Sequence, residues 1–261
     1  METDLFTLPL SGWGLAVVCA LFIGMSKAGL PGLGLIAVPL MAMVFPPTLS
    51  TGILLPILIT GDLFGVLYYH RHADWKVLFR LMPAAFAGII IGFLLLKLLL
   101  RGDADQANEI IRISIGLLVL LLILLNFCKQ RLHLTELNDL SPKWSVAVAI
   151  VFGVLAGIAT QIANAAGPIT LIYLLAMHMP KETFIGTSAW YFCIMNWCKV
   201  PFMIGLGSIT TQSLLFNLKL VPVVFVGALI GIFISSKLSR KSFEKWIVLL
   251  TVLAAFKLLI K

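Results

Sequence analysis

The chain is a succession of long apolar runs separated by short polar or charged breaks. Because a transmembrane helix needs about 20 apolar residues, we interpret each run as a helical segment that crosses or enters a bilayer. The breaks predict ten segments, five on each side of a polar linker over residues 128–143. They span residues 12–26, 31–45, 49–69, 76–100, 110–127, 144–159, 165–179, 183–203, 213–236 and 246–260.

The composition supports a membrane protein. Of the 261 residues, 61% are hydrophobic and 11% are charged, whereas a soluble domain has about 25% charged residues. A water-soluble globule of this size cannot bury so much apolar surface, which excludes a cytosolic enzyme, a nucleic-acid-binding module and a disordered chain. The fold class that we expect is an all-α polytopic membrane protein.

Glycine, proline and one polar position recur in the two halves of the chain, which indicates an internal duplication. The matches are Gly24/Gly157, Gly34/Gly167 and Pro47/Pro180 at an offset of 133 residues, Asp62/Asn196 at 134, and Pro83/Pro222, Gly88/Gly227 and Gly92/Gly231 at 139. We therefore expect a first repeat over residues 1–127 and a second over residues 144–261, with about five segments each.

The first two segments of each repeat are predicted to be short and broken. At 1.5 Å per residue, about 15 residues cover about 22 Å, which is less than the apolar core of about 30 Å. Whether these segments cross the bilayer fully or turn back is left open by the sequence.

The distribution of lysine and arginine predicts the orientation. Three loops carry most of the basic residues: Arg71, Lys76 and Arg80; Lys129, Arg131 and Lys143; and Lys237, Arg240, Lys241 and Lys245. With five segments per repeat these loops lie on one side, which the positive-inside rule makes cytoplasmic. The linker 128–143 is then cytoplasmic and the N-terminus outside. The net charge of +8 thus marks membrane topology and not nucleic acid. An odd number of segments inverts the second repeat, as in many secondary transporters.

A glycine-rich stretch, Gly24–Gly34, joins the first two segments. It contains Lys27, Pro31 and three glycines, Gly29, Gly32 and Gly34. A helix that stops and restarts here exposes backbone amides that favour an anion, and Lys27 adds a full positive charge. The alternative is that these glycines only let helices pack closely.

The corresponding stretch of the second half is residues 160–168, which contains Gln161, Asn164 and Gly167. In an inverted arrangement the two breaks enter from opposite faces, so we expect them to meet near the middle of the bilayer.

Three charged residues lie inside apolar segments, namely Lys27, Asp62 and Lys199. A charge at this depth costs about 2.5–3.5 kcal/mol, so each should face a cavity or a partner. Either Asp62 and Lys199 form a structural ion pair, or Lys199 helps to hold an anion and Asp62 carries a proton. Asn196 precedes Lys199 at helical spacing and is a hydrogen-bonding candidate.

Other chemistries lack their sequence signatures. The chain has no HExxH motif, no nucleophile and base at catalytic spacing, and no phosphate loop for ATP. The four cysteines, Cys19, Cys128, Cys193 and Cys198, form no CxxC pair and are interpreted as core residues. We therefore expect no cofactor, no metal and no enzymatic activity.

These motifs resemble the sulfite exporter TauE/SafE family, also called the 4-toluene sulfonate uptake permease family. The resemblance lies in the break Gly24–Gly34 with the later Pro39, in Gly157–Pro168, in the run IGTSAWYF followed by Asn196, and in the repeated Pro-Gly-Gly pattern. It covers nearly the whole chain. It implies a multi-pass carrier of the bacterial inner membrane that moves sulfite or organosulfonates without ATP. The second motif here has less glycine than is usual in the family.

We therefore expect a secondary transporter, an exporter of small sulfur-containing anions, that alternates access around an anion bound at midplane. The predicted binding residues are Lys27, Gly29, Gly32, Gly34, Gln161, Asn164, Gly167, Asn196 and Lys199, with Asp62 as the candidate for proton coupling. The alternatives are an anion channel and an accessory membrane subunit. The sequence leaves open the exact substrate, the direction, the coupling ion and the choice between a monomer and a homodimer.

Overall fold

The computed structural model describes residues 6–99, 142–239, 242 and 245, and the regular elements in these ranges are helices. They are α1 (Leu10–Ala28), α2 (Gly34–Ala42), α3 (Pro47–Tyr69), the 3-10 helix η2 (His70–His72), α4 (Trp75–Leu99), α6 (Pro142–Ala163), α7 (Gly167–Leu175), α8 (Lys181–Gly205) and α9 (Thr211–Lys237). Eight of the predicted segments are thus found as helices. The segments predicted at 110–127 and 246–260, and the linker 128–143 up to residue 141, lie outside the described residues.

Five helices in the described ranges are long and apolar enough to cross a membrane. They cover Leu10–Ala28, Leu49–His72, Trp75–Leu98, Trp144–Ala163 and Thr211–Lys237. Helix α8 has 25 residues, and its buried polar residues include Asn196 and Lys199. By these lengths and compositions the chain is an all-helical polytopic membrane protein.

The first helix of each half is longer than predicted. α1 has 19 residues and α6 has 22, so the expectation that the first two segments of each half are both short is wrong for these two. Only α2 and α7 are short, with nine residues each. Each long helix extends beyond its predicted segment at both ends: α1 covers Leu10–Ala28 against the predicted 12–26, and α6 covers Pro142–Ala163 against the predicted 144–159.

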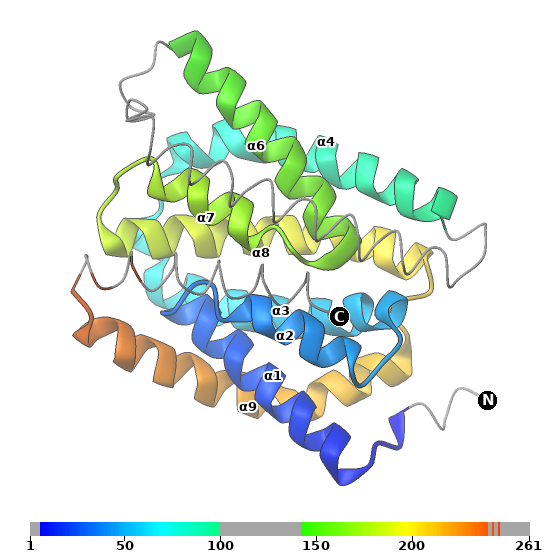
Figure 1. Ribbon diagram of the computed structural model, residues 1–261. Helices are drawn as coiled ribbons and strands as arrows, with labels where there is room; N and C mark the ends of the chain where they lie inside the picture. Colours follow the sequence, from blue (N-terminus) through cyan, green and yellow to red (C-terminus); the bar gives the residue numbers. More distant parts are fainter. Residues whose placement is uncertain (1–5, 100–141, 240–241, 243–244, 246–261) are drawn as a thin grey trace.

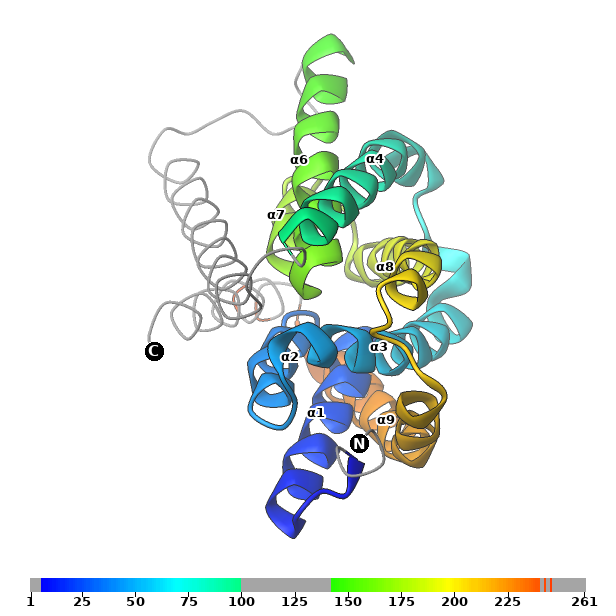
Figure 2. The same ribbon diagram turned by 90° about the vertical axis from the view of Figure 1, so that its right-hand side faces the viewer.

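The helices form two groups that exchange a helix between the halves of the chain. Figures 1 and 2 show α9, from the end of the described chain, beside α1, α2 and α3, whereas α4 lies with α6, α7 and α8. Helices α3 and α8 pack against each other where the two groups meet (Figure 2). Residues of both halves therefore face each other along this contact.

Close backbone contacts occur at matching positions in the two groups. A Cβ atom on Gly24 would overlap the backbone of Val224 in α9, and a Cβ atom on Gly157 would overlap the backbone of Ala85 in α4. Gly24 and Gly157 correspond at the offset of 133 residues, and Ala85 and Val224 at 139. Small residues let membrane helices approach each other this closely.

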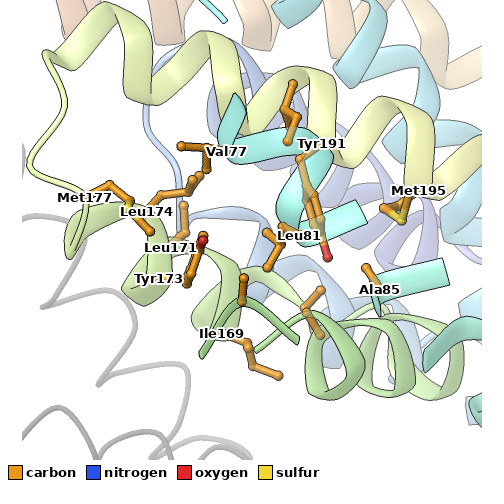
Figure 3. Packing of buried hydrophobic residues seen from close by; sticks show 14 of the residues in the cluster. Val77, Leu81, Ala85, Ile169, Leu171, Tyr173, Leu174, Met177, Tyr191 and Met195 are labelled. Atoms are coloured by element: carbon orange, nitrogen blue, oxygen red, sulfur yellow. The ribbon is translucent and has the colours of Figure 1, made fainter. Parts of the chain in front are cut away.

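A large apolar cluster fixes the short helix α7 (Figure 3). It joins residues of α4, α7 and α8, including Val77, Leu81, Ala85, Ile169, Leu171, Tyr173, Leu174, Tyr191 and Met195. A helix of nine residues is not stable alone in water and depends on such packing. The cluster thereby determines where the N-terminus of α7 lies.

Candidate functional site

Each half of the chain has a break between a long helix and a short one. α1 ends at Ala28 and α2 begins at Gly34, while α6 ends at Ala163 and α7 begins at Gly167. The first break contains Gly32 with φ 107°, and the second contains Asn164 with φ 53°. Positive φ is open to glycine and, among other residues, is best tolerated by asparagine and aspartate.

A cavity of about 50 Å³ lies between these two breaks. The first break contributes Gly32 and Gly34, and the second contributes Asn164 and Gly167. Other parts of the wall come from Ser26, Lys27, Pro31, Leu58, Thr160, Leu171, Ser188, Ala189, Phe192 and Asn196. The two interruptions, which the sequence predicts to meet, therefore line the same cavity.

Both short helices begin at this cavity. Gly34 is the first residue of α2 and Gly167 the first of α7, and both line the wall. The N-cap residue of α7, Ala166, makes no side-chain cap hydrogen bond. Since a helix N-terminus carries partial positive charge, the two termini favour negative charge in the cavity.

Lys27 is the charged residue on the cavity wall. Its Nζ atom lies 2.8 Å from Oδ1 of Asp62 and 4.1 Å from the ring centroid of Phe192. The Lys27 side chain is 11% exposed and the Asp62 side chain 0%. Lys27 lines the cavity and Asp62 does not, and the aromatic ring offers the ammonium a second, favourable contact.

Asp62 is held by two donors. Besides Lys27, the Nδ2 atom of Asn196 donates to Oδ2 of Asp62 at 2.7 Å. The possible ion pair between Asp62 and Lys199 is therefore not the arrangement that forms. Asp62 and Asn196, which match in the two halves, contact each other where α3 meets α8.

Lys199 is fully buried and lies behind the second break. Its ammonium donates to Oγ1 of Thr160 at 3.2 Å and to Oδ1 of Asn164. The Nδ2 atom of Asn164 donates to the carbonyl oxygen of Thr51 at 2.9 Å, which ties the break to α3. Lys199 therefore does not line the cavity itself but holds two residues that do.

Replacing Asn164 by glycine is expected to destabilise the protein by about 2–3 kcal/mol, because a hydrogen bond to a charged group contributes about 1.5–3 kcal/mol. Asn164→Ala should be less stable still, since alanine adds strain at positive φ while glycine does not. Thermal unfolding in detergent measures the stabilities of the unmodified protein and of both variants. Equal stability of Asn164→Gly and the unmodified protein would show that the Lys199 contact contributes little.

Two predicted site residues lie elsewhere. Gln161 is fully buried, but its Cβ atom lies 2.9 Å from where a Cβ atom on Gly92 would stand, so it faces α4. The cause is helical geometry: Gln161 follows Thr160, and successive residues point about 100° apart. Gly29 packs against the backbone of Gly231 in α9, so its role is the close packing given above as the alternative.

Ser26 and Phe192 line the cavity without having been predicted. Phe192 lies within the run IGTSAWYF, and a helical pattern points to it: Ser188, Phe192 and Asn196 are spaced four residues apart and share one face of α8. Ser26 has no such signal beyond its position next to Lys27.

No group of three or more His, Cys, Asp or Glu side chains that is able to hold a metal ion occurs in the described part of the chain. What the cavity presents instead is an ammonium, hydroxyl groups, amides and helix N-termini beside apolar side chains. This combination suits a small anion.

Comparison with known proteins gives one family. The model of the family described as "Sulfite exporter TauE/SafE" matches residues 16–258, which confirms the resemblance predicted from the sequence motifs. Comparison with curated proteins and with solved structures finds no match. The family match extends over both groups of helices and both breaks. The chain therefore belongs to the sulfite exporter TauE/SafE family and is a multi-pass membrane transporter of sulfur-containing anions, not an enzyme.

Proposed function

We propose that the protein is a secondary transporter that binds a small sulfur-containing anion in the cavity between the two breaks. The observation that carries this proposal is that both breaks line one cavity with Lys27 on its wall. An anion there meets the ammonium of Lys27 and the hydroxyl group of Ser26. The partial positive charges at Gly34 and Gly167 add to these contacts.

The size of the cavity favours an inorganic oxyanion. One water molecule needs about 10–15 Å³ measured in this way, so a volume of about 50 Å³ accommodates about three to five water-sized atoms. Sulfite has four non-hydrogen atoms. Organosulfonates are larger and need a wider conformation of the same site.

An internal two-fold relation supports alternating access. The contacts of Gly24 with α9 and of Gly157 with α4 match, and Asp62 contacts its counterpart Asn196. A residue that touches its own counterpart lies next to the two-fold axis. We propose two repeats, residues 1–127 and 144–261, inverted relative to each other, whose helix groups rock about the cavity. A cytoplasmic linker and an outside N-terminus remain predictions.

Flux of labelled sulfite into proteoliposomes tests the function. A carrier predicts saturable uptake that is accelerated by unlabelled sulfite inside the vesicles, since return of the loaded site is then faster than return of the empty one. Large single-channel currents without this acceleration would favour an anion channel. Absence of flux for sulfite and for organosulfonates would favour an accessory subunit.

A further inference from the structure

We infer that the site between the two breaks takes up one net negative charge: a monovalent oxyanion, or a divalent one together with one proton. This inference rests on the proposed function, because it concerns the charge of the species that occupies the same cavity. It is carried by the arrangement of Lys27, Asp62 and Lys199.

The described part of the chain contains one salt bridge, between Lys27 and Asp62. This pair contributes no net charge. Asp62 also accepts from the Asn196 amide, which is neutral, and Lys27 lies over the aromatic ring of Phe192, which is neutral as well. Whatever occupies the cavity therefore meets Lys27 as the outer half of a pair that is already balanced.

Lys199 supplies the charge that is not balanced. It is fully buried, and the two oxygen atoms that accept from its ammonium belong to Thr160 and Asn164, which are both neutral. In residues 6–99 and 142–239, Asp62 is the only fully buried carboxylate, and Lys27 already pairs with it. With Lys199 protonated, the site carries one positive charge, which lies one residue behind the cavity wall.

Two titratable groups of α8 lie close enough to interact with both Lys27 and Asp62, namely Lys199 and the buried thiol of Cys193. A neutral thiol does not change the net charge of the site. Helix α3 contributes Asp62 and α1 contributes Lys27. The groups that α6 presents to Lys199, at Thr160 and Asn164, do not titrate.

Uncompensated charge is costly inside a membrane protein. A monovalent anion brings the loaded site to zero charge, whereas a dianion alone leaves it negative. A dianion that enters with a proton gives the same total as a monovalent anion. Sulfite and hydrogensulfite interconvert near neutral pH, so the site can take its substrate as hydrogensulfite or as sulfite plus a proton held on Asp62.

A comparison of two pyramidal oxyanions, chlorate and sulfite, tests the effect of the ligand's charge apart from the effect of its shape. Chlorate has the shape of sulfite but one fixed negative charge, while sulfite changes its charge with pH. Chlorate keeps one charge at every pH, so the pH dependence of its affinity for the purified full-length protein between about pH 6 and 8 reports any titration of the site itself. Relative to the affinity for chlorate, the affinity for sulfite, expressed per dianion, should fall about tenfold for each unit of rising pH, because one proton more is bound with it. Calorimetric titration in detergent measures both.

Substitutions that change the net charge of the site provide a second test of the inference. Asp62→Asn raises the site to two positive charges, so sulfite should bind as the dianion and its affinity per dianion should lose its dependence on pH. Lys199→Met lowers the site to zero charge and should weaken chlorate at least tenfold. Lys76→Met, at an exposed lysine, is the matched control and should change neither affinity. If Asp62→Asn does not fold, the comparison of the two anions on the unmodified protein still tests the inference.

The outcomes distinguish this inference from the proposed function. If sulfite binds with an affinity per dianion that is independent of pH, and chlorate does not compete, the inference is wrong and the proposed transporter stands. If neither anion binds and sulfite flux is absent, the proposed function fails and this inference fails with it.

Discussion

Replacing Lys27 by methionine is expected to lower sulfite flux about 100-fold or more. Two effects act in the same direction. The variant loses the ammonium on the cavity wall, and it leaves the carboxylate of Asp62, which Lys27 contacts at 2.8 Å, facing the anion without a cation between them. Loss of a hydrogen bond to a charged ligand costs about 1.5–3 kcal/mol, about 1.4 kcal/mol corresponds to a factor of ten in affinity, and repulsion by the unpaired carboxylate adds to this loss. Initial rates in proteoliposomes measure the effect.

A stability control is needed because the same substitution leaves Asp62 buried and unpaired. The double variant Lys27→Met/Asp62→Asn removes both charges, so it should unfold close to the temperature of the unmodified protein while its flux stays low. Lys76→Met removes an exposed lysine and should retain full flux. If the double variant transports sulfite at the unmodified rate, the anion does not bind beside Lys27.

The number and order of the helices in the described ranges are predictable from the sequence, because an apolar run and a break are one-dimensional features. The short helices α2 and α7 are both predicted, although they begin a few residues after the predicted starts at residues 31 and 165. Gly34 and Gly167 match at an offset of 133 residues in the sequence, and each is the first residue of its short helix. The apolar bilayer leaves the backbone few alternatives to a helix, which makes such predictions sharper than for a soluble protein.

Helix ends and partners are not predictable in this way. The glycine-rich stretch Gly24–Gly34 predicts that the first helix ends at residue 26, yet α1 continues to Ala28, and Gly24 lies inside the helix against the backbone of α9. The partner of Asp62 is another example. Lys27 and Lys199 both lie inside apolar segments of the sequence, and only the packing of α1 against α3 decides that Lys27 forms the pair.

The site is predicted in outline and not in detail for the same reason. Residues at the two breaks are recognisable by glycine, proline and charge, and the breaks do line one cavity. The direction of a single side chain depends on its helical phase. Thr160 lines the cavity whereas Gln161 faces α4, although both are polar and adjacent in the sequence.

Alanine at Gly24 and, separately, at Gly157 is expected to destabilise the protein by about 1–3 kcal/mol each, the usual cost of an added methyl group in a packed interior. At both positions the new Cβ atom would overlap the backbone of the neighbouring helix, which has no flexible end that can move aside. α1 must then separate from α9, or α6 from α4. Chemical unfolding in detergent micelles measures both variants.

Gly14→Ala is the matched control for this pair of substitutions, because it changes a glycine of α1 that has open space around its Cβ position. It should leave stability unchanged or raise it by up to about 1 kcal/mol, since alanine favours a helix over glycine. Similar losses at Gly24 and Gly157 are what two equivalent repeats require, because each position makes the same contact in its own group of helices. A loss at only one of them would mean that the two groups are held together differently, and a rocking motion with two equivalent halves would then lack its structural basis.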